Sequence, residues 1–135
     1  MKIRVALDDI DEQNHVNNTV YLRWIQDVAV AHWRALASEE AQRDIRWVVV
    51  RHEIDYKAPG SLGEELILRT WVGQATRLRF ERLTEIVRAS DRRLLASART
   101  IWVPIDSLTG KPTRVGAEIR QRFSTGGQQG SAAND

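Results

Sequence analysis

The sequence contains no cysteine, and this absence removes several chemistries at once. Without thiols, the 135-residue chain can form no disulfide, no thiolate metal site and no cysteine nucleophile. A serine nucleophile is not expected either, because no Gly-x-Ser-x-Gly sequence occurs and no serine has a hydrolase-type arrangement of His and Asp. The lack of thiols is compatible with a reducing compartment, and we expect a cytoplasmic protein.

Long hydrophobic runs are absent as well. No window approaches the roughly 18 consecutive apolar residues that a membrane-spanning helix requires. Residues 1–5 enter an alternating strand pattern directly, without the apolar region of a signal peptide. The sequence therefore predicts neither a membrane-embedded protein nor a membrane partner.

A strong excess of one charge is missing too, since 20 Lys and Arg residues face 18 Asp and Glu residues. Most of the basic residues are arginines, and the pI is about 9.4. A basic stripe could bind nucleic acid or the phosphates of a nucleotide-like cofactor, but a solvated surface is the simpler interpretation of any single arginine. Nucleic-acid binding is not expected, because the strand arginines alternate with Glu81 and Glu85 and not with exposed aromatic residues.

The chain length and composition fit a single domain. A hydrophobic content of 42% and a charged content of 28% are ordinary for a soluble globular protein, and 135 residues suffice for one core. We expect this domain to span residues 1–123. Residues 124–135 are rich in Gly, Gln, Ser and Ala and are predicted to be a disordered tail.

One long helix is predicted after a polar loop over residues 8–16. Apolar residues recur at steps of three and four from Val20 to Leu36, which indicates a helix of about five turns that is largely buried. Asn17 or Asn18 is a suitable N-cap, because its side chain can accept a hydrogen bond from a free backbone N–H. The polar segment 38–44 is either a short helical extension or a loop.

Five strands are predicted from alternating apolar and polar residues and from the turns between them. They cover residues 2–8, 46–57, 66–72, 77–88 and 93–103. Pro104 is expected to end the last strand, and residues 115–123 suit a short helix. In the second strand the pattern places Val48, Val50, His52, Ile54 and Tyr56 on one face.

Strands joined by short turns form an antiparallel meander, and a single apolar helix must cover one face of that sheet. The sequence therefore predicts an α+β fold in which a five-stranded antiparallel sheet wraps round one long central helix. The other face of the sheet carries the more polar residues Glu53, Arg69, Arg79 and Glu85. We expect part of that face to be available for dimerisation.

Two motifs resemble a known family. The pattern Asp11-x-x-x-His15-Val16-Asn17-Asn18-x-x-Tyr21-Leu22-x-Trp24 resembles the loop of bacterial acyl-CoA thioesterases related to 4-hydroxybenzoyl-CoA thioesterase, and that of plant acyl-ACP thioesterases. Residues 48–50, followed by Ile54-x-Tyr56-x-x-Pro59, resemble the next strand and turn of the same enzymes. The resemblance covers residues 3–120 and implies the hot-dog fold and hydrolysis of an acyl-CoA or acyl-ACP thioester.

The resemblance also implies partners and site residues. It implies a homodimer or homotetramer with active sites between subunits, no metal and no redox cofactor, with coenzyme A present only as part of the substrate. The family's catalytic carboxylate corresponds to Asp11, and the plant enzymes' Asn, His and later Glu correspond to Gln13, His15 and Glu53. Gln13 departs from the pattern, because it is a longer amide than asparagine.

Thioester hydrolysis needs a base or nucleophile and a donor for the developing oxyanion. Asp11 can serve as either base or nucleophile. Backbone N–H groups of the first helical turn, around Asn17, Asn18 and Thr19, can polarise the carbonyl.

Each candidate also has a purely structural interpretation. Asp11 can form a turn, His15 can hold the loop, Asn17 and Asn18 can cap the helix, and Glu53 can pair with an arginine. Two alternatives to hydrolysis share the same fold, namely a hydratase or dehydratase acting on an enoyl thioester, and an acyl-CoA-binding or regulatory domain without turnover.

Overall fold

Secondary structure follows the predicted order along the chain. The computed structural model describes residues 1–123, and the predicted disordered tail, 124–135, lies outside the described residues. The helical elements are the 3-10 helix η1 (Leu7–Asp9), α1 (Asn18–Leu36) and α2 (Glu39–Asp44). The strands are β1 (Lys2–Arg4), β2 (Ile45–Tyr56), β3 (Glu65–Ala75), β4 (Phe80–Arg88) and β5 (Leu94–Asp106). Residues 117–123 are helical, within the short helix that was predicted.

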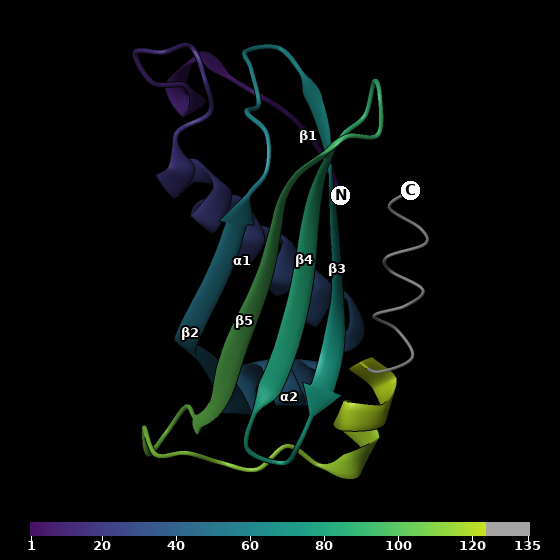
Figure 1. Cartoon of the computed structure of the whole chain (residues 1–135). Helices are drawn as coiled ribbons and strands as arrows, with labels where there is room; N and C mark the ends of the chain where they lie inside the picture. The colour runs from purple at the N-terminus through teal and green to yellow at the C-terminus, as the bar shows by residue number, and fades with distance from the viewer. Residues whose placement is uncertain (124–135) are drawn as a thin grey trace.

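The strands form one antiparallel sheet in the order β1-β3-β4-β5-β2. The long helix α1 lies against one face of this sheet, with β2 at one edge and the short β1 at the other (Figure 1). This arrangement confirms the predicted α+β architecture of five antiparallel strands and one central helix. No helix within residues 1–123 is long and apolar enough to cross a membrane.

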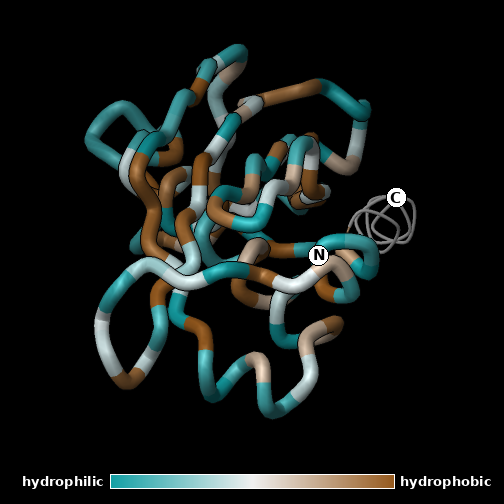
Figure 2. Tube along the Cα trace, turned by 90° about the horizontal axis from the view of Figure 1, so that it is seen from below, coloured by the Kyte–Doolittle hydropathy of each residue, from teal (hydrophilic) through white to brown (hydrophobic). Residues whose placement is uncertain are grey.

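The core forms where the apolar stripe of α1 meets the sheet. Leu66, Leu68 and Leu95 are completely buried there against Tyr21 and Ile25 of the helix. Hydrophobic and hydrophilic residues alternate at short intervals along the strands (Figure 2). One face of β3 and of β4 contributes to this cluster, whereas the consecutive residues Leu95 and Ala96 of β5 both belong to it. A second cluster of buried aromatic residues lies nearer the C-terminal end of α1.

The predicted face of β2 is wrong in its first half. The register with β5 shifts between Val49 and Arg51, which makes Val50 an extra residue and reverses the alternation. As a result, Trp47 packs into the second core cluster. Val48 and Val50 are 46% and 56% exposed. The bulge could not be predicted, because residues 47–50 are all apolar and the sequence does not indicate which of them face the core.

Pro104 does not end the last strand, contrary to the prediction. It lies within β5 opposite Trp47, and its carbonyl accepts a hydrogen bond from the Thr113 N–H at 3.0 Å. The neighbour β4 begins at Phe80, opposite Trp102, so β4 does not reach Pro104. The N–H that proline lacks lies on this side, where residues 111–113 take the place of β4 beside the end of β5, so no hydrogen bond to β4 is lost.

One shorter element differs from its predicted extent, and the structure decides the open interpretation of another. The first strand ends at Arg4, because residues 7–9 turn into a 3-10 helix. The polar segment 38–44, for which two interpretations were open, contains the separate helix α2. Its N-cap is Ser38, whose hydroxyl accepts from the Ala41 N–H at 3.1 Å.

Candidate active site

The polar loop before α1 contains a buried aspartate, Asp9. Its Oδ1 accepts a hydrogen bond from Arg23 Nη2 at 2.9 Å, and its Oδ2 accepts one from the Ala6 N–H at 2.9 Å. The residue is only 6% exposed, and its carbonyl accepts the Asn17 N–H at 2.9 Å. Asp9 therefore ties the start of the loop to α1.

Asp11, by contrast, is exposed and closes a tight turn. Its Oδ1 accepts the backbone N–H groups of Gln13 (2.9 Å) and His15 (3.3 Å). The Asp11 N–H in turn donates to the His15 carbonyl at 2.8 Å. Asn14 has a φ of 65°, a conformation that asparagine tolerates better than most residues. Asp11 thus shapes the turn with one oxygen, while Oδ2 has no hydrogen-bond partner within residues 1–123.

A second loop, residues 57–64, supports the first. The Val16 N–H donates to the Gly60 carbonyl at 2.9 Å, and His15 forms a bridge with Ser61. The Gly60 N–H donates to the Tyr21 hydroxyl at 3.0 Å, and burial raises the pKa of that hydroxyl. A Cβ on residue 60 would lie 3.0 Å from Val16 Cγ2, so glycine permits the close approach of the two loops.

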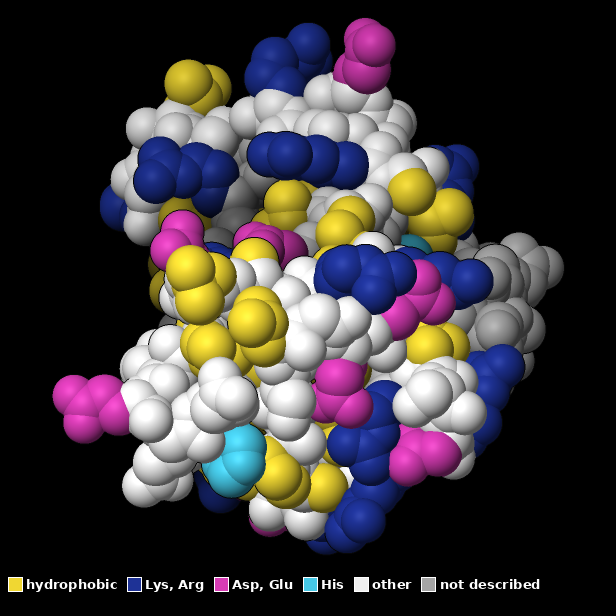
Figure 3. Space-filling view, turned by 90° about the horizontal axis from the view of Figure 1, so that it is seen from above, with side chains coloured by type: hydrophobic (Ala, Val, Ile, Leu, Met, Phe, Trp, Pro, Cys, Tyr) yellow, Lys and Arg dark blue, Asp and Glu magenta, His cyan; other side chains and the backbone are white. Residues whose placement is uncertain are grey.

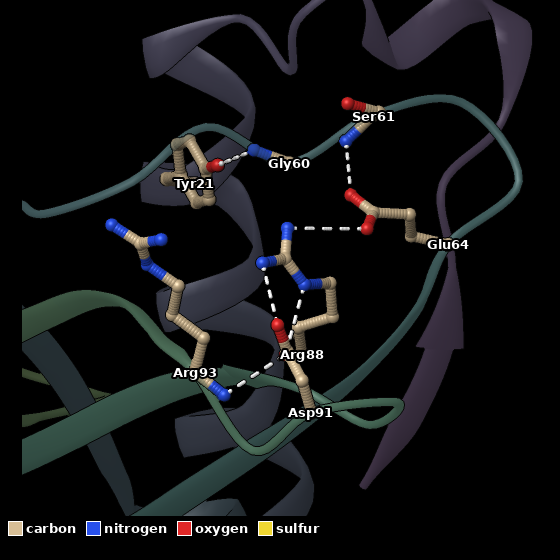
Figure 4. Close-up of polar contacts among 7 residues, drawn as sticks. All are labelled: Tyr21, Gly60, Ser61, Glu64, Arg88, Asp91 and Arg93. Atoms are coloured by element: carbon tan, nitrogen blue, oxygen red, sulfur yellow. Dashed lines mark hydrogen bonds and ion pairs between the residues drawn. The ribbon is translucent and has the colours of Figure 1, made fainter.

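The second loop is held in turn by a chain of charges (Figure 4). Glu64 Oε1 accepts the Ser61 N–H at 2.6 Å, and Glu64 Oε2 lies 3.3 Å from Arg88 Nη1. The same guanidinium donates to both Asp91 oxygens, at 3.0 and 2.9 Å. Hydrogen bonding from Arg88 lowers the pKa of Asp91 to about 2. The turn after β4 is therefore coupled to the loop that supports His15.

These two loops and the start of α1 surround an open cavity of about 430 Å³. Five of the predicted site residues line it: Asp11, Gln13, His15, Asn17 and Asn18. Tyr56, the last residue of β2, and Lys57, which follows it, also line the cavity and were not predicted as site residues. Tyr56 belongs to the second motif, which was the available signal. Lys and Arg side chains lie in several separate groups on this end of the molecule, with Asp and Glu side chains between them (Figure 3).

The first turn of α1 offers fewer donors than the sequence predicted. Asn17 is the N-cap, and its Oδ1 accepts both the N–H (3.1 Å) and the hydroxyl (3.0 Å) of Thr19. Thr19 therefore has no free N–H for an oxyanion, and it does not line the cavity. The Asn18 N–H has no hydrogen-bond partner within residues 1–123. The Asn18 carbonyl accepts the Tyr56 hydroxyl at 3.3 Å.

The structure does not bring Glu53 to this cavity within the chain. Its side chain lies on the face of the sheet away from α1, opposite Arg99 in the β2–β5 ladder. Its Oε1 is 2.6 Å from Arg51 Nη2 and 3.6 Å from Arg99 Nη1. The strand alternation that predicted its side also predicts this separation from the helix face. Within residues 1–123, no group of three or more His, Asp or Glu side chains is placed to hold a metal ion.

Comparisons with known proteins support the predicted family and fold. The family model of the thioesterase-like superfamily matches residues 5–123. The chain resembles Slr0204, a 1,4-dihydroxy-2-naphthoyl-CoA thioesterase from Synechocystis, at 24% identity and a TM-score of 0.78, covering 91% of this chain and 93% of that one. The chain also resembles YbaW, a probable thioesterase from Escherichia coli, at 26% identity and a TM-score of 0.77. This match covers 92% of this chain and 95% of YbaW.

A thioesterase-superfamily protein from Jannaschia sp. CCS1 gives a TM-score of 0.86 at 20% identity, covering 95% of this chain and 82% of that one. No curated protein matches the sequence. The structural matches confirm the predicted hot-dog fold.

Proposed function

Because the chain belongs to the thioesterase-like superfamily, we propose that it hydrolyses an acyl-CoA or acyl-ACP thioester to the free acid and the thiol. The observation that carries this proposal is the exposed Asp11 carboxylate beside the N-terminus of α1, in a cavity of about 430 Å³. A carboxylate and a helix N-terminus supply the two groups that acyl transfer requires, a base or nucleophile and a partial positive charge.

In the first form of the mechanism, Asp11 acts as a general base. It removes a proton from water as the water oxygen attacks the thioester carbonyl carbon. The Asn18 N–H and the partial positive charge of α1 stabilise the oxyanion of the tetrahedral intermediate. The C–S bond then breaks, and the leaving thiolate takes the proton back from Asp11. His15, whose imidazole is exposed at the cavity, and Gln13 position the water or the thioester.

In the second form, the Asp11 carboxylate attacks the carbonyl itself. The thiolate leaves, and water hydrolyses the resulting mixed anhydride to the acid and the free carboxylate. A single turnover in ¹⁸O-labelled water tests for the anhydride, because ¹⁸O in Asp11 can arise only in the second form. A covalent anhydride that is hydrolysed at the Asp11 carbonyl leaves ¹⁸O in Asp11, whereas general-base attack by water places the label only in the product acid.

The substrate panel should include aromatic acyl-CoA compounds. Two of the similar structures are a 1,4-dihydroxy-2-naphthoyl-CoA thioesterase and a gentisyl-coenzyme A thioesterase. The cavity wall also contains Tyr21 and Tyr56, whose ring centroids are 5.6 Å apart. Aromatic side chains of this kind provide a flat apolar surface next to polar groups.

A homo-oligomer is part of the proposal. Strand β2 is a 12-residue edge of the sheet that exposes Val48 and Val50, and an uncovered edge of this length is prone to pair with another chain. Pairing of two β2 edges would place the loop cavities of two subunits near a common interface. Light scattering coupled to size-exclusion chromatography tests this, and a strictly monomeric protein would contradict it.

The direct test measures thiol release from the acyl-CoA panel by the wild type, Asp11→Asn and the control Glu12→Gln. The asparagine keeps the Oδ1 acceptor of the turn but cannot act as a base. We expect kcat to fall about 10²- to 10⁴-fold in Asp11→Asn, with an unchanged unfolding midpoint. Glu12→Gln, next to it on the exposed loop, should retain full activity. Undiminished hydrolysis by Asp11→Asn, or tight acyl-CoA binding without thiol release by the wild type, would contradict the proposal.

A further inference from the structure

A second cavity of about 50 Å³ lies between the C-terminal half of α1 and the sheet. It shares no lining residue with the cavity around Asp11. Along α1, the lining residues Ala29, Val30 and Trp33 are about 17 to 22 Å from Asn18, at 1.5 Å per residue. The two cavities are therefore separate sites on the same helix.

The walls of the second cavity are aromatic. They are formed by Trp33, Trp47, Phe80, Trp102 and Phe123. The rings contact one another, with centroid distances of 4.8 Å between Trp47 and Phe80 and 5.3 Å between Trp33 and Phe123. Such walls favour a flat apolar ligand, because ring faces and edges pack well against another ring.

A single cation, Arg82, lies among these rings. It lines the cavity and is 6% exposed. Its Nη1 donates to Thr70 Oγ1 at 3.1 Å and to His32 Nδ1 at 2.9 Å, and neither acceptor is an anion. No ion pair joins Arg82 to an Asp or Glu within residues 1–123. Burial lowers the pKa of Arg82 to about 10, so the guanidinium remains charged at neutral pH.

A buried cation without an anion is an unfavourable arrangement. Both hydrogen bonds of Arg82 use Nη1, which leaves Nε and Nη2 without an acceptor in the described part of the chain. The buried Trp102 Nε1, on the cavity wall, also has no hydrogen-bond partner there. Arg82 and Trp102, which each carry a donor group without an acceptor in residues 1–123, therefore line the same cavity.

We propose that this cavity binds the carboxylate of a small aromatic acid. The planar fork of Arg82 matches a carboxylate in geometry and charge, and the Trp102 N–H is the second donor. The cavity of about 50 Å³ accommodates the carboxylate end. The ring extends between the aromatic walls toward Val30, which is 37% exposed at the rim. The site does not depend on the chemistry proposed for Asp11.

Titration of the ¹⁵N-labelled full-length protein with sodium benzoate tests the proposal. The five tryptophan indole N–H resonances are resolved by nuclear magnetic resonance and assigned with Trp→Phe variants. We expect saturable shifts of the Trp102 and Trp47 resonances at millimolar benzoate. Trp71, which lines a cavity on the other face of the sheet, serves as the internal control and should not shift.

Two control ligands are compared with sodium benzoate. Benzamide has the same ring without the charge, and sodium chloride gives the same ionic strength without the ring. We expect benzamide to bind at least about tenfold more weakly than benzoate, and chloride to produce no saturable shift. Equal affinity for benzamide would overturn the role of Arg82, and an equal response to chloride would reduce the site to a nonspecific anion effect. The absence of any saturable benzoate shift would overturn the site itself.

Two variants extend the test to the cation. Arg82→Met should abolish the benzoate shifts, and Arg82→Lys should weaken benzoate binding at least about tenfold, because lysine keeps the charge but loses the planar fork. Circular dichroism verifies that each variant is folded. If Arg82→Met does not fold, the lysine variant and the comparison of benzoate with benzamide on the wild type still test whether Arg82 binds the carboxylate. Unchanged benzoate affinity in a folded variant would contradict the proposal.

Discussion

The carboxylate of Asp9 is buried, and its Oδ1 lies 2.9 Å from Arg23 Nη2, whereas the carboxylate of Asp11 is exposed at the cavity. The two residues are of the same type and almost adjacent in the chain, yet their surroundings give them different tasks. Asp9 satisfies donors that hold the loop on α1. Asp11 has an oxygen available to water or substrate, so only Asp11 is suited to chemistry.

The first prediction concerns the structural task of Asp9. Asp9→Ala leaves the Ala6 N–H, which now makes a partly buried hydrogen bond, without an acceptor and Arg23 without its ion pair. We expect a loss of about 1–3 kcal/mol of unfolding free energy, measured by urea denaturation. Asp8→Ala is the control, because the Asp8 side chain is exposed and makes no hydrogen bond within residues 1–123. Equal stability of the two variants would show that the Asp9 contacts contribute little.

The second prediction separates helix capping from catalysis at Asn17. Asn17→Ala removes the acceptor for Thr19 and should lower the unfolding free energy by about 0.5–2 kcal/mol. Asn17→Ser keeps a capping oxygen and should be close to the wild type in both stability and kcat. If Asn17→Ser folds normally but loses kcat as severely as Asp11→Asn, the Asn17 side chain acts on the substrate and not only on the helix.

The third prediction concerns the hydroxyl groups of the two tyrosines that line the cavity. Tyr21→Phe leaves the buried Gly60 N–H without a partner, which should cost about 1–3 kcal/mol of unfolding free energy and disturb the loop that supports His15. Tyr56→Phe is the matched control, because its hydroxyl is exposed and makes only a long 3.3 Å bond to the Asn18 carbonyl. A smaller stability loss in Tyr21→Phe than in Tyr56→Phe would contradict the role assigned to Tyr21.

Much of the fold could be predicted because strands and helices have characteristic repeats. The apolar steps from Val20 to Leu36 match α1, and the alternation in β3 and β4 identifies the buried faces. The bulge at Val50 and the continuation of β5 through Pro104 could not be predicted. Both depend on how neighbouring strands pair, which is a non-local property.

The candidate site shows the same division between local and non-local information. Asp11, His15 and Asn17 lie in one loop, and a local motif therefore groups them. Glu53 lies in β2, and Lys57 is the first residue after that strand, yet only Lys57 lines the cavity. Deciding between them required the direction in which each side chain leaves the backbone near the end of β2.

The fourth prediction follows from the position of Glu53. Its carboxylate pairs with Arg51 and Arg99 on the face of the sheet away from α1. We therefore expect Glu53→Gln to retain kcat/KM within about threefold and, since exposed ion pairs contribute little, to lose at most about 1 kcal/mol of unfolding free energy. A fall in kcat comparable with that of Asp11→Asn would instead show that Glu53 takes part in catalysis, as the family resemblance implies.

The fifth prediction is a pH dependence of stability that originates at Asp91. Arg88 lowers the pKa of Asp91 from its ordinary 3.8 to about 2 in the folded state. A carboxyl group with a lowered folded pKa binds its proton more readily in the unfolded chain. Its stabilising contribution is therefore fully present above about pH 4 and is lost as the pH falls toward about 2.

Asp91→Asn should accordingly be less stable than the wild type at neutral pH, and the difference should shrink through this window. Urea denaturation of both proteins across the pH range measures the difference, with Asp8→Asn as the exposed control. A difference that stays constant down to about pH 2 would show that the Arg88–Asp91 pair does not determine the acid sensitivity of the loop network.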